Sequence, residues 1–241
     1  MNKLYVIGLG PGGRDYLTLR AIEAIKESDL IVSYTKYLKY AKDLVEGKEV
    51  FTSGMKEEIK RCEYAIEGAL KGKTVSILST GDSGLYGMAG PIFELSQGKN
   101  IDIEVIPGVS AIFAAASRLG APLMHDVAII SLSDLLTPLD LIMERVDLAS
   151  KADFVLGFYN PRSKTREDYL EKAFDIIKKY KDPKTPCAYV KNALREGEKI
   201  KIASLDDFPF DEVDMNTIVI VGNKSSYTNL DKFITKRGYE I

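Results

Sequence analysis

Short apolar runs alternate along this chain with longer segments in which apolar residues recur at helical spacing. The runs, rich in Val and Ile, predict buried strands at 4–7, 30–33, 49–52, 75–79, 102–106, 127–132, 153–159, 187–190, 199–204 and 217–221. The amphipathic segments predict helices at 18–26, 34–46, 57–70, 91–95, 110–116, 137–149, 165–180 and 231–237. This alternation predicts an α/β fold, with crossover helices and mainly parallel pairing in the first half.

The pattern breaks at Leu119-Gly-Ala-Pro-Leu123. Glycine and proline punctuate regular structure, and a chain of 241 residues is long enough for two small domains. We therefore predict two α/β domains, covering 1–119 and 120–241.

Composition excludes several classes of protein. Hydrophobic residues make up 45% of the chain and charged residues 28%, as in a soluble globular protein. A net charge of −2 gives no basic field for nucleic acid. No apolar run approaches the roughly 20 residues that span a bilayer, and the N-terminal residues lack the apolar region of a signal peptide. With only Cys62, Cys187 and His125 as soft ligands, we predict no metal site and a cytoplasmic protein.

The stretch Thr80-Gly-Asp-Ser-Gly-Leu-Tyr-Gly-Met88 joins a predicted strand to a predicted helix. Glycines let a backbone approach a ligand closely, and ligands of parallel α/β sheets bind beyond the carboxyl ends of the strands. This loop is therefore a candidate ligand site with Asp82 as its one carboxylate. The alternative is a glycine-rich turn in which Asp82 caps the next helix, expected to open at Gly90-Pro91.

A second glycine turn follows the first strand. Gly8, Gly10 and Gly13 fit the spacing of a dinucleotide-binding turn. However, Pro11 removes an amide donor, the next helix is delayed, and the second strand ends in Ser33-Tyr34-Thr35 without the acid that would bind a ribose. An NAD-dependent oxidoreductase built on 8–13, a plain structural turn and a loop facing a substrate all remain open.

Taken in order, the motifs of the whole chain resemble the tetrapyrrole methyltransferase family. They are Gly8-Leu-Gly-Pro-Gly12, Leu17-Thr-Leu-Arg-Ala21, Thr80-Gly-Asp82, Pro107-Gly-Val-Ser-Ala111 and Val190-Lys-Asn-Ala193. Further stretches resemble the subgroup of precorrin-3B and cobalt-precorrin-3 C17-methyltransferases, namely Ser33-Tyr-Thr-Lys-Tyr-Leu38, Ser53-Gly-Met55, Gly81-Asp-Ser-Gly-Leu-Tyr-Gly-Met-Ala-Gly90, Ala121-Pro-Leu-Met-His-Asp126, Ser131-Leu-Ser-Asp-Leu-Leu-Thr-Pro138 and Phe158-Tyr-Asn-Pro-Arg-Ser163.

The resemblance implies a homodimer of two-domain chains with S-adenosyl-L-methionine held in a cleft between the domains. By position it assigns to this cofactor Gly81, Asp82, Leu85, Ser110, Ala111, Asn160, Ala193 and Thr217. It also implies that the turn containing Gly10, Pro11 and Gly12 faces the tetrapyrrole.

The resemblance further implies methylation of a precorrin-3-type tetrapyrrole at C17 with ring contraction in cobalamin biosynthesis, leaving S-adenosyl-L-homocysteine. The substrate would be precorrin-3B or cobalt-precorrin-3, and the sequence leaves the presence of cobalt open. An enzyme of the same fold acting at another corrin position, such as C11 of precorrin-4, is the alternative.

Four groups of residues are candidates for the chemistry. Asp82 is the first candidate for a carboxylate near the reacting centre, unless it only binds the cofactor. Ring contraction needs an acid–base group, and His125, the one imidazole, is either that group or structural. Ser131 and Asp134 are candidates for binding substrate carboxylates, as is Arg162, which offers a cation; a helix cap and a solvated loop are the respective alternatives.

Overall fold

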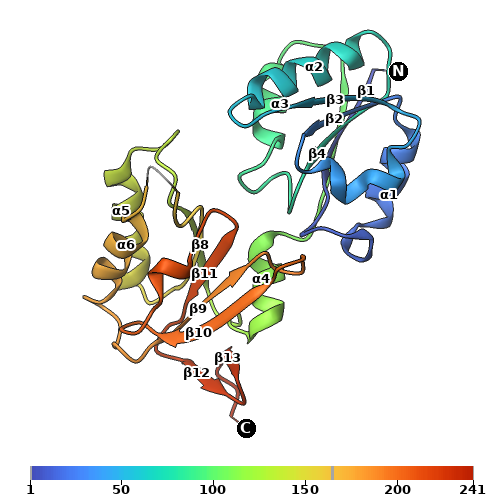
Figure 1. Cartoon of the computed structure of the whole chain (residues 1–241). Helices are drawn as coiled ribbons and strands as arrows, with labels where there is room; N and C mark the ends of the chain where they lie inside the picture. The colour runs from blue at the N-terminus through green and yellow to red at the C-terminus, as the bar shows by residue number, and fades with distance from the viewer. Residues whose placement is uncertain (1, 164–165, 241) are drawn as a thin grey trace. The chain divides into compact units, whose positions relative to one another are not determined.

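The computed structural model describes residues 2–163 and 166–240. The chain divides into two compact units, Met1–Ala111 and Ile112–Ile241, drawn in Figure 1 from blue to green and from green to red. The predicted boundary lay after residue 119, whereas the contacts group almost all of helix α4 (Ala111–Leu119) with the second unit.

The first unit contains a five-stranded, fully parallel sheet in the order β3-β2-β4-β1-β5. Its strands are β1 (Lys3–Gly8), β2 (Leu30–Tyr34), β3 (Glu49–Ser53), β4 (Val75–Ser79) and β5 (Asp102–Ile106). All five confirm the predicted runs. Alternate residues of the central strands β1, β2 and β4 enter separate cores, as the two-residue period of a strand requires.

Helices cover both faces of this sheet. Helix α1 (Leu19–Glu27) and the 3-10 helix η2 (Leu38–Leu44) share a core with Tyr5 and Ile7. On the other face, α2 (Glu58–Leu70) and α3 (Ala89–Leu95) pack with Leu4 and Val6. The connections through α1 and η2 lead along the sheet towards β3, and the connections through α2 and α3, on the other face, lead towards β5. The connections that leave the carboxyl ends of the neighbouring strands β1 and β4 therefore pass to opposite faces of the sheet, and an open α/β sheet forms its binding crevice at such a point.

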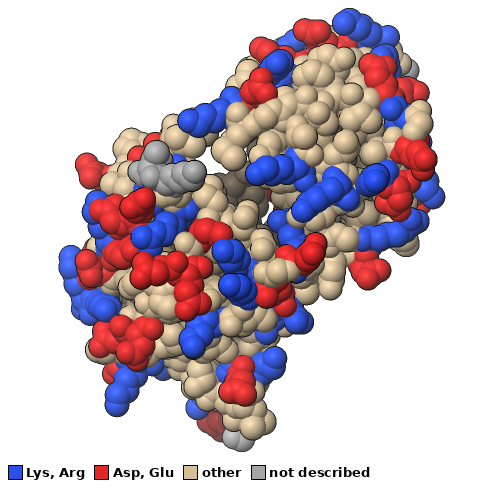
Figure 2. Space-filling model, in the orientation of Figure 1, with Lys and Arg blue, Asp and Glu red and all other residues tan. Residues whose placement is uncertain are grey.

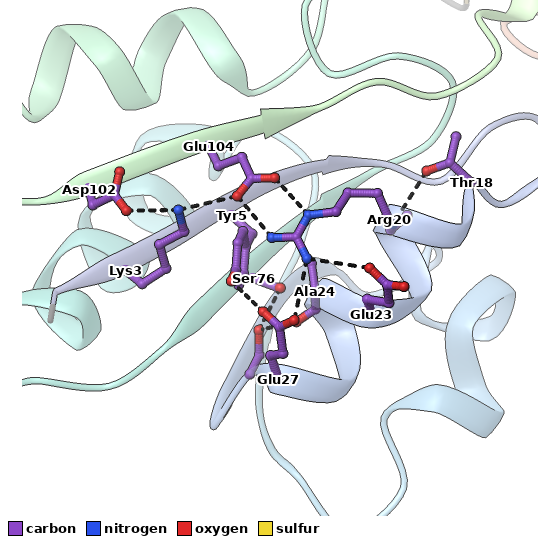
Figure 3. Close-up of polar contacts among 12 residues, drawn as sticks. Lys3, Tyr5, Thr18, Arg20, Glu23, Ala24, Glu27, Ser76, Asp102 and Glu104 are labelled. Carbon is purple, nitrogen blue, oxygen red and sulfur yellow. Dashed lines mark hydrogen bonds and ion pairs between the residues drawn. The ribbon is translucent and has the colours of Figure 1, made fainter.

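Arg20 fastens α1 to the sheet (Figure 3). Its guanidinium binds Glu104 of β5 through two hydrogen bonds of 2.8 and 2.9 Å and lies over the ring of Tyr5, 5.1 Å from its centroid. Thr18 caps the amino end of this helix, because its hydroxyl accepts a hydrogen bond from the amide of Ala21 at 3.1 Å. This anchorage holds the segment that follows the first glycine turn.

The second unit contains a mixed sheet in the order β10-β9-β11-β8-β7 and a small sheet in the order β12-β13-β6. Only β7 and β8 pair in parallel within the larger sheet. The strands are β6 (Gly120–Ala121), β7 (Val127–Ser131), β8 (Val155–Tyr159), β9 (Pro186–Lys191), β10 (Lys199–Ser204), β11 (Thr217–Val221), β12 (Ser226–Asn229) and β13 (Lys232–Thr235).

Helices α5 (Leu139–Lys151) and α6 (Tyr169–Ile177) pack on one face of the larger sheet, around Phe158 and Phe174. Helix α4 lies against the opposite face at Gly157, where an added Cβ would come within 2.2 Å of Ile112 Cδ1. A glycine on β8 therefore allows α4 to approach the sheet closely. None of the described helices is long and apolar enough to cross a membrane.

Two predicted helices differ from the structure. Residues 34–46 were predicted to contain a helix, and they do, but it is the 3-10 helix η2: the amides of Tyr37 and Tyr40 bind the carbonyls three residues before them, and η2 is kinked at Ala41 (φ −127°). Residues 231–237 were predicted to be helical, but they contain strand β13, in which buried Phe233 and Thr235 alternate with Lys232 and Ile234. A turn at Leu230 and Asp231, both with positive φ, pairs this strand with β12.

Three helix starts also differ. Helix α3 begins at Ala89, so that Pro91 lies within the first turn, where it interrupts no intrahelical hydrogen bond. Helix α5 begins at Leu139, two residues after the predicted start, with Pro138 in the N-cap position. Helix α6 begins at Tyr169, and Thr165, the predicted start of that helix, lies outside the described residues.

Candidate functional site

The glycine turn after β1 and the loop after β4 lie side by side at the carboxyl edge of the first unit's sheet. The backbones of Gly10 and Gly81 form an isolated antiparallel bridge, with N–H to carbonyl distances of 3.0 and 2.7 Å. The amide of Leu9 binds the carbonyl of Ser79 at 2.8 Å. Pro11 and Gly12 are buried as well. The two motifs identified separately in the sequence thus form one structure.

Glycines make this close packing possible. A Cβ on Gly108, in the loop after β5, would lie 2.3 Å from the carbonyl oxygen of Gly81 and 2.6 Å from that of Gly8. A Cβ on Gly8 would lie 2.7 Å from the same Gly81 oxygen. Gly81 itself has a φ of +69°, which favours glycine. Loops after β1, β4 and β5 therefore meet at backbone distance.

Asp82 joins two of these loops. One carboxylate oxygen accepts a hydrogen bond from the amide of Gly84 at 2.8 Å, and the other accepts one from the amide of Gly108 at 3.0 Å. Helix α3 has no side-chain cap, so the alternative that Asp82 caps it is excluded. The carboxylate is half-buried and retains lone pairs for a further donor.

The neighbours of Asp82 complete this corner of the first unit. Ser83 is fully buried, and its hydroxyl donates to the carbonyl of Val6 at 3.2 Å, which fixes the loop to β1. A Cβ on Gly81 would lie 3.6 Å from the amide nitrogen of Ala111 and 3.9 Å from Cα of Ser110. Leu85 is half-buried on the same loop. The structure therefore brings together all the predicted cofactor residues that belong to the first unit.

Arg61 supports the same carboxyl edge of the sheet, and the sequence did not reveal this role. Its side chain, on α2, is 6% exposed and donates to the Ser53 hydroxyl at 2.8 Å and the Gly54 carbonyl at 2.6 Å. The guanidinium also lies over the ring of Tyr34, 5.6 Å from its centroid. The spacing of α2 could not reveal this contact, because arginine at that position is equally suited to a solvated helix face.

In the second unit, polar residues gather beyond the carboxyl ends of β7 and β8. The Asn160 side-chain amide donates to the Ser131 hydroxyl at 2.8 Å, and Asn160 has a positive φ of 52°. Asp134 accepts from the Tyr169 hydroxyl at 2.8 Å and pairs with Arg166 at 3.5 Å. The Tyr169 hydrogen bond is the main cause that holds the pKa of Asp134 below its usual value.

The two arginines after Asn160 have different surroundings. Arg162 pairs with Glu171 at 3.3 Å and Asp211 at 3.8 Å and donates to the Phe210 carbonyl at 3.0 Å. Arg166 is 6% exposed and donates to the Ser133 hydroxyl at 2.9 Å. The candidate substrate cation, Arg162, is therefore already held by two carboxylates.

Of the remaining predicted residues of the second unit, His125 lies apart from this cluster, whereas Ala193 and Thr217 lie at the same edge of the larger sheet as Asn160, because β11 pairs antiparallel with both β8 and β9. His125 precedes β7, at the opposite end of that strand from Ser131, and its imidazole lies 3.7 Å from the Asp126 carboxylate. Ala193 follows β9 and is buried, and Thr217 begins β11, where its hydroxyl donates to Asp214 at 3.0 Å. Their assigned roles stay predictions.

The first-unit corner fits the donor that the sequence resemblance implies. S-adenosyl-L-methionine carries ribose hydroxyls, an ammonium and a sulfonium, all of which suit a nearby carboxylate with free lone pairs. The glycine loops expose backbone rather than side chains to a ligand. The corner fits a dinucleotide less well. A dinucleotide needs the N-terminus of a helix for its phosphates, whereas the turn that ends at Gly13 leads into the three-residue 3-10 helix Arg14–Tyr16.

Comparison with known proteins gives a consistent result. Residues 3–209 match the family described as tetrapyrrole (corrin/porphyrin) methylases. A probable cobalt-factor III C(17)-methyltransferase of Salmonella typhimurium is 48% identical over 99% of this chain and 100% of its own length. A precorrin-3B C(17)-methyltransferase of a Sinorhizobium species is 35% identical over 91% of this chain and 88% of its own.

The structure agrees with these sequence matches. It superposes on the crystal structure of the methyltransferase CobJ with a TM-score of 0.90, at 31% identity, covering 97% of this chain and 99% of that one. These matches do not support the alternative of an NAD-dependent oxidoreductase built on residues 8–13.

Proposed function

The chain belongs to the family of tetrapyrrole (corrin/porphyrin) methylases, and from this premise we propose that it methylates C17 of cobalt-factor III. Its family and the names of its relatives show that the chain is a methyltransferase. The cobalt-containing substrate is favoured over precorrin-3B because the relative named for cobalt-factor III is 48% identical and the one named for precorrin-3B is 35% identical.

The observation that supports this proposal best is the corner formed by residues 8–12, 81–85 and 108–111. Asp82 fixes the loop after β4 to the loop after β5 through Gly84 and Gly108. We infer that Gly81, Asp82, Leu85, Ser110 and Ala111 hold S-adenosyl-L-methionine, with the turn at Gly10, Pro11 and Gly12 next to it facing the macrocycle. The roles of Asn160, Ala193 and Thr217 towards the donor are part of the same proposal.

When bound, S-adenosyl-L-methionine supplies an electrophilic methyl group and leaves as S-adenosyl-L-homocysteine. The acceptor carbon of a tetrapyrrole is already electron-rich, so the main contribution of the protein is to hold donor and acceptor in line and close together. Asp82 would accept hydrogen bonds from the donor's hydroxyls or ammonium while its backbone partners keep the loop rigid. Ring contraction, with His125 as a candidate acid–base group, belongs to the proposal as well.

The oligomeric state and location complete the proposal. We infer a homodimer in the cytoplasm, as the family resemblance implies. Sedimentation equilibrium over a range of concentrations tests the first point, since a dimer gives twice the monomer mass of 26.7 kDa.

Incubation of the protein with S-adenosyl-L-methionine and either cobalt-factor III or precorrin-3B tests the reaction. We expect a mass gain of one methyl group on cobalt-factor III, located at C17 by NMR. A product methylated at another carbon, such as C11, or turnover of precorrin-3B alone, would contradict the proposed substrate. If the protein binds S-adenosyl-L-homocysteine but methylates no tetrapyrrole when S-adenosyl-L-methionine is supplied, the function is contradicted.

A further inference from the structure

The segment between β2 and β3 carries a row of lysines without acidic partners. Lys36, Lys39 and Lys42 are all exposed, and none forms an ion pair with any described residue. The segment has two carboxylates: Asp43, which already pairs with Arg14 at 2.5 Å, and Glu46, which forms no ion pair with a described residue. Figure 2 shows basic side chains close together over this part of the first unit, whereas blue and red are interspersed over much of the remaining face.

The backbone conformation explains why these lysines form a row. Residues spaced by three lie above one another along a 3-10 helix, because it has three residues per turn. Turns of this kind run from Tyr34 through Tyr37 to Tyr40, with hydrogen bonds of 2.8 and 3.0 Å, and η2 continues them. Lys36 and Lys39 therefore lie on one side, and Lys42 follows the kink at Ala41.

The row is fixed to the edge of the sheet at which ligands bind. The amide and hydroxyl of Thr35 both donate to the carbonyl of Ser53, at 3.2 and 3.0 Å. Buried Arg61 holds Ser53 and Gly54 through hydrogen bonds and supports Tyr34 from below its ring. The ring of Tyr37 meets that of Tyr34 edge-on at 4.9 Å. A buried cation thus braces a segment whose own exposed charge is also positive.

The same segment lies next to the turn that we assign to the macrocycle. The Arg14–Asp43 ion pair connects η2 to the residues directly after the first glycine turn, and η2 shares a core with α1 and Leu9. The lysines are therefore at the carboxyl edge of the sheet, beside residues 8–13. Of the two acidic side chains of their own segment, Asp43 is held by Arg14, and Glu46 forms no ion pair with a described residue.

We propose that Lys36, Lys39 and Lys42 form an anchor for the peripheral carboxylates of the tetrapyrrole, which sets the binding and orientation of the substrate without taking part in methyl transfer. The inference rests on the proposed function for the identity of the occupant. Tetrapyrroles of this route carry acetate and propionate side chains around the ring, so a row of point charges can bind several of them at once. Lysines suit this task because their ammonium groups tolerate many carboxylate positions.

Titration with porphyrins of different charge tests the anchor apart from catalysis. Uroporphyrin has a carboxylate on every side chain, and coproporphyrin has half as many. We expect the variant Lys36→Gln/Lys39→Gln/Lys42→Gln to bind uroporphyrin about tenfold more weakly than the wild type, as the sum of a few exposed ion pairs. Coproporphyrin should show a smaller loss, and high salt should reduce both differences.

The matched control is Lys151→Gln/Lys179→Gln/Lys199→Gln, which removes three lysines that are also exposed and also form no ion pair among the described residues. The control should bind uroporphyrin as the wild type does, and both variants should keep the wild-type affinity for S-adenosyl-L-homocysteine. Equal losses in both variants, no loss in the first, or no binding of uroporphyrin to the wild type would each overturn the anchor.

The outcome separates this inference from the proposed function. With the true substrate, the anchor variant should raise KM for the tetrapyrrole about tenfold and leave kcat and the KM for S-adenosyl-L-methionine unchanged. If porphyrin binding depends on the lysines but no tetrapyrrole is methylated, the proposed function fails while the anchor stands. If methylation proceeds with unchanged KM in the variant, the anchor fails alone.

Discussion

At the scale of single residues, the candidate site depends on backbone contacts more than on reactive side chains. Asp82 is the clearest case, since both of its oxygens bind amides of its own edge of the sheet. Its sequence neighbours suggested that Asp82 either binds a ligand or caps a helix, and the structure shows that it bridges two loops. A residue in this position affects ligand binding both directly and through the shape of the loops.

The first prediction concerns this bridge. Asp82→Ala removes the acceptor of both amides, and we expect it to weaken binding of S-adenosyl-L-homocysteine by tenfold or more, about the value of one hydrogen bond to a charged group. Isothermal titration calorimetry measures the change. The control is Asp102→Ala, at the amino end of β5, where the carboxylate pairs with Lys3 at 2.8 Å. Equal affinities in the two variants would remove Asp82 from the site.

The second prediction concerns the glycines between the loops. Gly108→Ala places a Cβ 2.3 Å from the Gly81 carbonyl oxygen, and we expect it to lower the free energy of unfolding by about 1–3 kcal/mol, the usual effect of overpacking. Gly90→Ala is the matched control, since its Cβ would meet nothing within 4 Å and it lies inside α3. That variant should be neutral or slightly more stable, because alanine favours a helix. Urea unfolding measures both, and a harmless Gly108→Ala would show that the loops separate readily.

At the scale of elements, the contact of α1 with β5 has a defined dependence on pH. The hydrogen bond from Arg20 is the main cause that lowers the pKa of Glu104 from 4.5 to about 2. A depressed carboxyl pKa stabilises the folded state above the unfolded-state value and loses that effect as the pH falls through the folded-state value. The stabilisation is therefore present above about pH 4.5 and disappears towards pH 2.

The third prediction follows from this window. Glu104→Gln should lower Tm by about 3 °C at pH 7, a modest effect because the pair is partly exposed and screened. The difference from the wild type should shrink as the pH falls from 4.5 towards 2. Glu23→Gln is the control, since Glu23 is 63% exposed and lies 3.7 Å from the same guanidinium. A difference in Tm that persisted unchanged at low pH would mean that packing, and not charge, explains the loss.

At the scale of the whole molecule, the sequence predicts what local patterns determine and fails where distant segments decide. Apolar runs locate every strand of the first sheet, and the signal is continuous in β1, β2 and β4 because these strands are buried on both faces. The hairpin containing Phe233 was missed, since its short strand is stabilised by pairing with Gly120, far away in the chain. Likewise, Asp82 was identified as a candidate, but its bond to Gly108 depends on how β5 is placed beside β1.

The last prediction links the site to the stability of the whole protein. A ligand that binds only the folded state raises the free energy of unfolding by about 2.7 kcal/mol at a concentration of 100 times its Kd, which is about 5–10 °C in Tm for a chain of this size. S-adenosyl-L-homocysteine at that excess should raise the Tm of the wild type by this amount, and NAD should not. Differential scanning fluorimetry measures the increments.

Two variants show whether this increment reports on the site. Ile177→Val, in the core around Phe174, should lower the starting stability by about 1 kcal/mol and keep the full increment, because the loss of a methyl group there does not touch the ligand. Asp82→Ala should lose most of the increment at the same ligand concentration, because its Kd is higher. If both variants kept the increment, the donor would bind somewhere other than the loop after β4. If NAD alone raised Tm, the glycine turn at 8–13 would hold a dinucleotide after all.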